Sequence, residues 1–129
     1  MEFESYKQFW NHQAATPESA LAAVDGSVSE EVVQITGRST ARQVATALEL
    51  NKEDRTLELG CGVGRIGREL APHCARWTGV DISEKMISHA RERLGHLENT
   101  DFHLLQRTSL EAIADGSLTK AYSVAVLCH

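Results

Sequence analysis

The chain has 129 residues, which is the size of a single domain. Its net charge of −5 and the lack of a lysine- and arginine-rich run argue against a nucleic-acid partner. No apolar run approaches the ~18 residues of a membrane span. The three cysteines, an odd number without zinc-type spacing, argue against a disulfide framework and against a metal site. We therefore expect a cytoplasmic protein without a membrane partner.

Four helical patterns precede residue 51. The first carries an apolar stripe that includes Tyr6 and Trp10. The second begins at Pro17, a residue that is favoured in the first turn of a helix. We expect the third pattern to stop near Gly37, because glycine often follows the last residue of a helix. The fourth opens with a capping box and ends near Leu50.

The most informative segment runs from Thr56 to Gly67, where a short apolar run enters a glycine-dense turn and a helical pattern. Such a tight turn needs backbone angles that side chains disfavour, and glycine also lets a ligand approach the main chain. The start of the following helix offers N–H groups to a carboxylate or phosphate. Asp81 ends the next apolar run, 21 positions after Gly60, near the ~20 expected for a carboxylate that binds ribose hydroxyls. These features predict a pocket for an adenosine-containing cofactor.

The glycines between Gly60 and Gly67 fit two patterns. The last three match the dinucleotide fingerprint G-x-G-x-x-G, which would indicate a nicotinamide-dependent oxidoreductase. The first three form the tighter G-x-G-x-G, which we favour. Glu58 stands two residues before the first glycine, and apolar Ile82 follows Asp81 where an adenine face would need packing. About fifty residues of helical pattern also precede the glycine strand.

Three further apolar runs follow the glycine turn. We expect a second strand over Trp77 to Asp81, a third over Phe102 to Leu105 and a fourth over Tyr122 to Cys128. The fourth run is nearly all apolar, which suits a parallel strand that is covered on both faces. A helix capped by Ser83 lies between the second and third strands.

The stretches Glu58 to Arg65 and Gly79 to Ser83 resemble the first two motifs of the class I S-adenosylmethionine-dependent methyltransferases. The resemblance runs from about Gly37 to His129 and looks most like the bacterial small-molecule or unassigned branch. It implies an α/β fold with a Rossmann-like parallel sheet. It also implies S-adenosylmethionine as cofactor, S-adenosylhomocysteine as product and a small-molecule methyl acceptor.

The resemblance implies a role for each motif residue. In the family, the residue that matches Glu58 lies near the methionine amino group, and the glycines pass under the methionine and the ribose. The residue that matches Asp81 binds the ribose diol, and the one that matches Ile82 packs on adenine. Arg38 would neutralise the cofactor carboxylate, with an ordinary surface arginine as the alternative. Leu127 lies at the tip of the fourth strand, which in the family borders the transferred methyl.

The chain departs from the family after the third strand, where an aspartate usually reads the adenine amino group. Gln106 or Arg107 stands in its place, so Thr108, Ser109 or a backbone carbonyl would substitute. No catalytic residue is assigned. The cofactor-binding candidates are Arg38, Glu58, Gly60, Cys61, Gly62, Gly64, Asp81, Ile82, Met86, Thr108, Ser109 and Leu127.

The family sheet has seven strands, and this sequence supplies four, with the implied order 3-2-1-4. Residues 1–50 form an N-terminal helical segment that packs on or caps the cofactor site, and residues 51–129 form a partial cofactor-binding domain. The fourth strand would leave an apolar edge. The chain is then a fragment of a longer methyltransferase, a homodimer through that edge, or a domain with a bare edge. A non-catalytic module that binds the cofactor or its product is the alternative function, ahead of the oxidoreductase.

Overall fold

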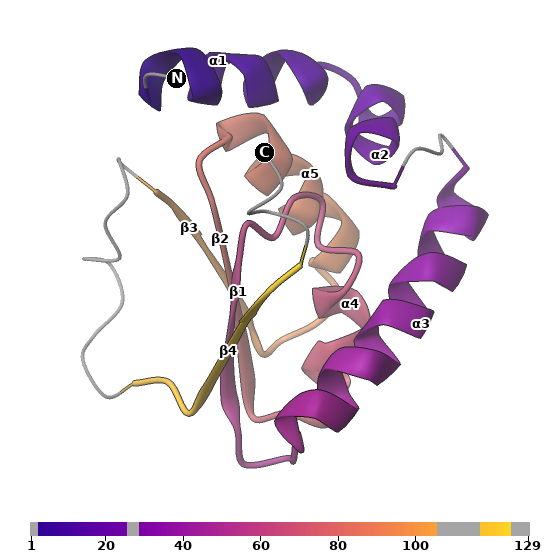
Figure 1. Ribbon diagram of the computed structural model, residues 1–129, viewed down its shortest axis with the longest axis vertical. Coiled ribbons are helices and arrows are strands. Elements are labelled where there is room, and N and C mark those ends of the chain that lie inside the picture. Colours follow the sequence, from indigo (N-terminus) through magenta and orange to yellow (C-terminus); the bar gives the residue numbers. More distant parts are fainter. Residues whose placement is uncertain (1–2, 26–28, 106–116, 125–129) are drawn as a thin grey trace.

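Four parallel strands form the sheet in the order β3-β2-β1-β4, which confirms the expected α/β class and strand order (Figure 1). The computed structural model describes residues 3–25, 29–105 and 117–124. The strands are β1 (Arg55–Leu59), β2 (Arg76–Asp81), β3 (Thr100–Leu104) and β4 (Lys120–Ser123). The helices are α1 (Phe3–Gln13), α2 (Pro17–Asp25), α3 (Glu30–Leu48), α4 (Gly67–Leu70), the 3-10 helix η1 (Ala71–His73) and α5 (Glu84–Leu94).

The third and fourth strands begin two residues earlier than the apolar pattern predicts. Backbone pairing causes this difference, because Trp77 N–H donates to Asn99 O at 2.9 Å just before β3. On the other side of the sheet, Thr119 N–H donates to Arg55 O at 2.8 Å just before β4. Polar residues can therefore enter a strand when a neighbouring strand offers hydrogen-bond partners. The expected continuation of the fourth strand beyond Ser123 to Cys128 lies largely outside the described residues.

The crossover helices α4 and α5 lie on the same face of the sheet. The chain moves from β1 to β2 and then to β3 in one direction across the sheet, and right-handed crossovers then place both helices on one side. α3 packs against α4, and α1 contacts the N-terminal part of α5 (Figure 1). The N-terminal helices α1 and α3 thus pack against the helices that follow the glycine turn and β2. Within the described residues, no helix is long and apolar enough to cross a bilayer.

The expected helix break near Gly37 is wrong, because α3 is one continuous helix of 19 residues. Its N-cap is Ser29, whose side chain accepts from Val32 N–H, and its C-cap is Glu49 in a left-handed conformation. Gly37 is buried where α3 meets the glycine turn, and a Cβ on it would lie 2.8 Å from Arg65 O. The glycine therefore allows a close approach between two segments and does not end the helix.

Trp77 is the largest side chain of the core beneath α4. The indole is 0% exposed and meets Phe102 edge-on, with ring centroids 5.6 Å apart. It occupies the space that two glycines leave open. A Cβ on Gly67 would lie 2.2 Å from the indole, and a Cβ on Gly79 would lie 2.6 Å from it. The indole therefore lies close to both Gly67, at the start of α4, and Gly79 of β2.

Candidate functional site

The glycine turn joins the carboxyl end of β1 to α4. Gly60, Gly62 and Gly64 have φ angles of 75°, 55° and 78°, which L side chains rarely adopt. The N–H groups of Gly60 and Cys61 both donate to Val80 O, at 2.8 and 3.0 Å. The first half of the turn is thereby fixed to the end of β2. The sequence pattern G-x-G-x-G coincides with these three left-handed positions.

Asp81 lies at the tip of β2 and points back to the glycine turn. Its Oδ2 accepts from Gly62 N–H at 2.9 Å, and its Oδ1 accepts from Ser83 N–H at 2.9 Å. Burial raises the pKa of Asp81, although the hydrogen bonds from Ser83, Gly62 and Ile82 N–H act in the opposite direction. The turn and the carboxylate that the sequence analysis paired are therefore in direct contact.

Glu58 is the second carboxylate at this end of the sheet. It is 3% exposed, and its Oε1 accepts a hydrogen bond from Tyr122 Oη at 2.9 Å. Burial raises the pKa of Glu58 to about 8, the Tyr122 hydrogen bond and the charge of Arg65 lower it, and the charge of Asp81 raises it further. A buried acid, Glu58, and a half-buried acid, Asp81, therefore lie at the mouth of the glycine turn, and both have raised pKa values.

The remaining candidates occupy different surroundings. Cys61 is buried against Gly79, and burial raises the pKa of its thiol. Ile82 is half-buried beside Asp81, whereas Met86 is buried in the cluster that joins α2 and α5. Arg38 is exposed, with 56% of its side chain accessible, and its Nε lies 3.7 Å from Glu69 Oε2. Thr108, Ser109 and Leu127 lie outside the described residues.

Two groups of residues near the site were missed by the sequence analysis. Trp77 Nε1 donates to Tyr122 Oη at 3.0 Å, so the hydrogen bond to Glu58 belongs to a longer chain of contacts. Asn11 of α1 accepts at Oδ1 from Ser83 Oγ at 2.6 Å, directly beside Asp81. A polar residue next to the apolar stripe of the first helix was the available signal for Asn11.

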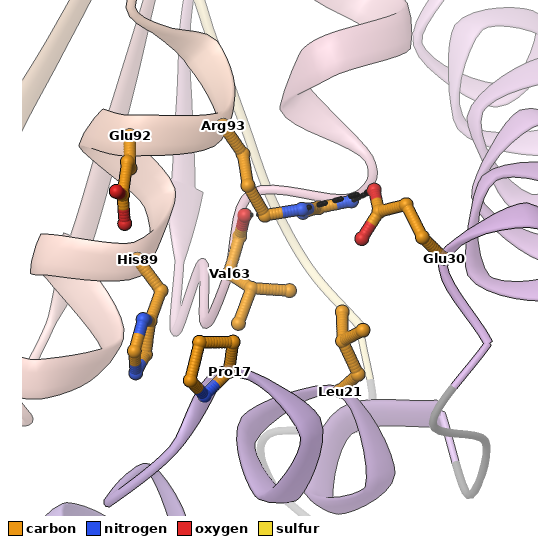
Figure 2. Close-up of a pocket in the computed structure, with 7 residues that line it drawn as sticks. All are labelled: Pro17, Leu21, Glu30, Val63, His89, Glu92 and Arg93. Carbon is orange, nitrogen blue, oxygen red and sulfur yellow. Dashed lines mark hydrogen bonds and ion pairs between the residues drawn. The ribbon is translucent and has the colours of Figure 1, made fainter.

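A cavity of about 160 Å³ lies on the outer side of the glycine turn (Figure 2). Its walls come from α2, the start of α3, the glycine turn and α5, and the residues are Pro17, Leu21, Glu30, Val63, His89, Glu92 and Arg93.

Arg93 connects three of the walls of this cavity. Its Nη1 donates to Val63 O at 2.5 Å, and its Nη2 pairs with Glu30 at 2.7 Å. Burial alone would raise the pKa of Glu30, but the contacts with Arg93, Gln34 and Arg68 together lower it. Arg93 therefore ties the carbonyl of the glycine turn to the start of α3. In the part of the chain that the structure describes, no cluster of His, Cys, Asp and Glu is arranged to hold a metal ion.

Residues 57–129 match the family model of the methyltransferase domain, which is more than half of the chain. The chain belongs to this methyltransferase domain family.

Two curated relatives and one solved structure illustrate the match. The 23S rRNA (uracil(1939)-C(5))-methyltransferase RlmD of Legionella pneumophila is 32% identical over 68 residues, which cover 51% of this chain and 15% of the relative. An uncharacterized methyltransferase of Alkaliphilus oremlandii is 26% identical over 102 residues, which cover 78% of this chain and 45% of the relative.

The solved structure is phosphoethanolamine N-methyltransferase 1 of Haemonchus contortus, in complex with phosphoethanolamine and S-adenosylhomocysteine. It superposes with a TM-score of 0.64 at 19% identity, over 80% of this chain and 21% of that one. At this identity the likeness concerns the fold. The matches span less than half the length of each of these three proteins.

Proposed function

We propose that this chain is the cofactor-binding part of an S-adenosylmethionine-dependent methyltransferase. The observation that carries the proposal is the contact between Gly62 N–H and the Asp81 carboxylate, at 2.9 Å. It brings a backbone that only glycine adopts easily next to an acid at the tip of the adjacent strand, which is where open α/β sheets bind nucleosides. Membership of the methyltransferase domain family makes the sulfonium cofactor the favoured nucleoside.

The charges of the site support a cationic ligand. Glu58 and Asp81 both have raised pKa values because burial penalises their ionised forms, and each carboxylate would be stabilised by a nearby positive charge. S-adenosylmethionine carries an ammonium group and a sulfonium. The ammonium group of the amino-acid moiety, which S-adenosylmethionine and S-adenosylhomocysteine share, supplies such a charge for Glu58, so the acceptor set of the site fits this cofactor.

The residues of the site have separate tasks in this proposal. Asp81 accepts hydrogen bonds from the ribose hydroxyls while Gly62 and Ser83 hold its carboxylate in place. Glu58 receives the ammonium group of the methionine moiety. Gly60, Gly62 and Gly64 let that moiety lie against the main chain. Ile82 offers an apolar surface to adenine. When bound, the cofactor supplies an activated methyl group, so the protein mainly has to align an acceptor with it and exclude water.

The acceptor that we propose is a small molecule, since the net charge of −5 does not favour a polyanion. The Legionella relative is named as a 23S rRNA methyltransferase, so RNA is the alternative to exclude. Cys61 and Cys74 are free, buried thiols, which agrees with a reducing compartment such as the cytoplasm.

Isothermal titration of the purified chain with S-adenosylhomocysteine, S-adenosylmethionine and NADH tests the proposal. We expect saturable binding of the first two ligands and none of NADH. Preferential binding of NADH would instead identify the site as a dinucleotide site. Tritium transfer from labelled cofactor to a small-molecule extract, compared with ribosomal RNA, then separates the two acceptor classes. Binding without transfer to either pool would indicate a cofactor-binding module.

A further inference from the structure

The donors in the chain Trp77–Tyr122–Glu58 point in a single direction. Trp77 Nε1 lies 3.0 Å from Tyr122 Oη, and that oxygen lies 2.9 Å from Glu58 Oε1. An indole N–H is a donor only, so the tyrosine oxygen must accept from it. The single phenolic hydrogen is then directed to Glu58. Tyr122 is thereby a donor to Oε1 whether Glu58 is ionised or neutral.

The strand register places these groups together. Glu58 of β1 is paired with Tyr122 of β4 on one side and with Gly79 of β2 on the other. Because Gly79 has no side chain, the indole of Trp77 extends over it toward Tyr122. Trp77 itself is completely buried and wedged against the glycine at the start of α4. The tyrosine is therefore oriented by a rigid part of the core.

We propose that Tyr122 is a positioning residue, which holds Oε1 of Glu58 so that Oε2 is the oxygen presented to the ammonium group of the cofactor. This inference rests on the proposed function of the site. Among the described residues, Oε1 receives the tyrosine hydrogen bond, and no hydrogen bond to Oε2 is present. Tyr122 thus acts on the ligand through Glu58 and not by contact.

Burial is the largest cause of the raised pKa of Glu58, and four titratable groups face this carboxyl group. Tyr122 from β4 and Arg65 from the glycine turn favour the carboxylate, whereas Asp81 from β2 disfavours it. Cys61 in the turn has a raised pKa to which Glu58 contributes, and it therefore stays neutral. Because burial raises the pKa of Glu58 to about 8, the neutral form of Glu58 predominates in the ligand-free protein at pH 7. Binding of an ammonium group then ionises Glu58 and releases its proton.

The test compares wild type with Tyr122→Phe in titrations with S-adenosylhomocysteine between pH 6 and pH 9. Wild-type affinity should rise by about tenfold per pH unit and level off near the pKa of Glu58. The phenylalanine variant lacks the donor that favours the carboxylate, so the pH at which its affinity stops rising should be higher than in wild type. Its affinity should be lower than that of wild type at pH 7, and the difference should become smaller toward pH 9. An equal loss of affinity at every pH would show a purely structural role and overturn the proposal.

A second variant changes the donor without removing it. The chain has two tyrosines, so 3-fluorotyrosine incorporated in a Tyr6→Phe background labels position 122 alone. Fluorination makes the phenol a stronger hydrogen-bond donor, and the plateau should therefore begin at lower pH, opposite to Tyr122→Phe. The Tyr6→Phe protein with ordinary tyrosine is the matched control. If the pH at which affinity levels off shifts in the same direction in Tyr122→Phe and in the fluorinated protein, the proposal is contradicted.

A ligand-free measurement separates this inference from the proposed function. The carboxyl carbon of Glu58, labelled with ¹³C and assigned with Glu58→Gln, gives the ionisation midpoint directly by NMR. We expect a higher midpoint in Tyr122→Phe and a lower one in the fluorinated protein. If wild type binds no S-adenosylhomocysteine, the proposed function fails. An unchanged midpoint in both variants refutes the positioning role of Tyr122 by itself.

Discussion

Gly62 and Asp81 are 19 residues apart in the chain, and the backbone N–H of the first donates to Oδ2 of the second at 2.9 Å. The bond closes a ring that contains the whole of α4, η1 and β2. The left-handed glycine and the acid therefore hold each other in place. A substitution at either residue should therefore alter the position of the other, so this contact is the best place to test the site.

Asp81→Asn should weaken the binding of S-adenosylhomocysteine by at least about tenfold, because a charged hydrogen bond contributes roughly 1.5–3 kcal/mol. The amide also turns an NH₂ group toward Gly62 or Ser83 N–H, which are both donors. Isothermal titration measures the loss. The control is Asp101→Asn, an acid of β3 that pairs with Arg76 on the surface and should leave the affinity unchanged. Equal affinities of the two variants would remove Asp81 from the site.

Asn11→Ala should loosen α1. Ser83 is 0% exposed and donates from Oγ to Asn11 Oδ1 at 2.6 Å, so the substitution leaves a buried hydroxyl without its acceptor. Such a loss costs about 1–3 kcal/mol, and we expect the amides of α1 to exchange with deuterium at least fivefold faster. His12→Ala, an exposed neighbour in the same helix, is the control. Identical exchange in both variants would show that other contacts hold α1.

Gly37→Ala separates two opposing effects in α3. Helix propensity alone would stabilise the protein by up to about 1 kcal/mol. The new Cβ would instead lie 2.8 Å from Arg65 O, a backbone atom of the glycine turn that cannot move freely. Overpacking of this kind costs about 1–3 kcal/mol, so we expect a net loss of unfolding free energy in urea. Ser39→Ala, exposed on the same helix, should be neutral or slightly stabilising. A more stable Gly37→Ala protein would contradict the close contact.

Glu58→Gln should change how stability depends on pH. The pKa of Glu58 is about 8 in the folded protein, above the ordinary value of 4.5. The unfolded chain therefore releases its proton first, and this group lowers the unfolding free energy as pH rises from 4.5 to 8. The expected slope is about 1.4 kcal/mol per pH unit.

Glutamine keeps an oxygen for Tyr122 and has no proton to lose, so the difference between variant and wild type should grow through that range and be constant above it. Urea unfolding at several pH values measures this difference. Glu53→Gln, an exposed acid before β1, is the control. A difference that does not vary with pH would mean that Glu58 ionises normally.

Local sequence patterns predicted those structural features whose physical cause lies within one turn or one helix end. The three left-handed glycines are needed within one turn, and Ser83 caps α5 through its own contact with Met86 N–H. The spacing from the glycines to Asp81 reflects one strand–helix–strand unit of ordinary length. The strand order followed from the family resemblance and was confirmed by the pairing of the strands.

Long-range contacts were not predictable in the same way. Gly37 has the sequence signal of a helix end, but its role depends on Arg65 in a different segment. The hydrogen bond from Tyr122 to Glu58 spans 64 residues and depends on the register between β1 and β4. No periodicity within either strand specifies that register. The apolar pattern predicted that a fourth strand forms, but it did not predict which residues of β1 pair with it.

The indole of Trp77 and the two glycines that accommodate it also limit how this domain can diverge. A methyl group at position 67 or 79 would enter the space of the ring, so either glycine can be replaced only after the tryptophan has become a smaller residue. The reverse order of substitutions is blocked by steric overlap. We therefore expect positions 67, 77 and 79 to covary among homologous sequences, with the exchange of the aromatic residue preceding any gain of a side chain at the other two.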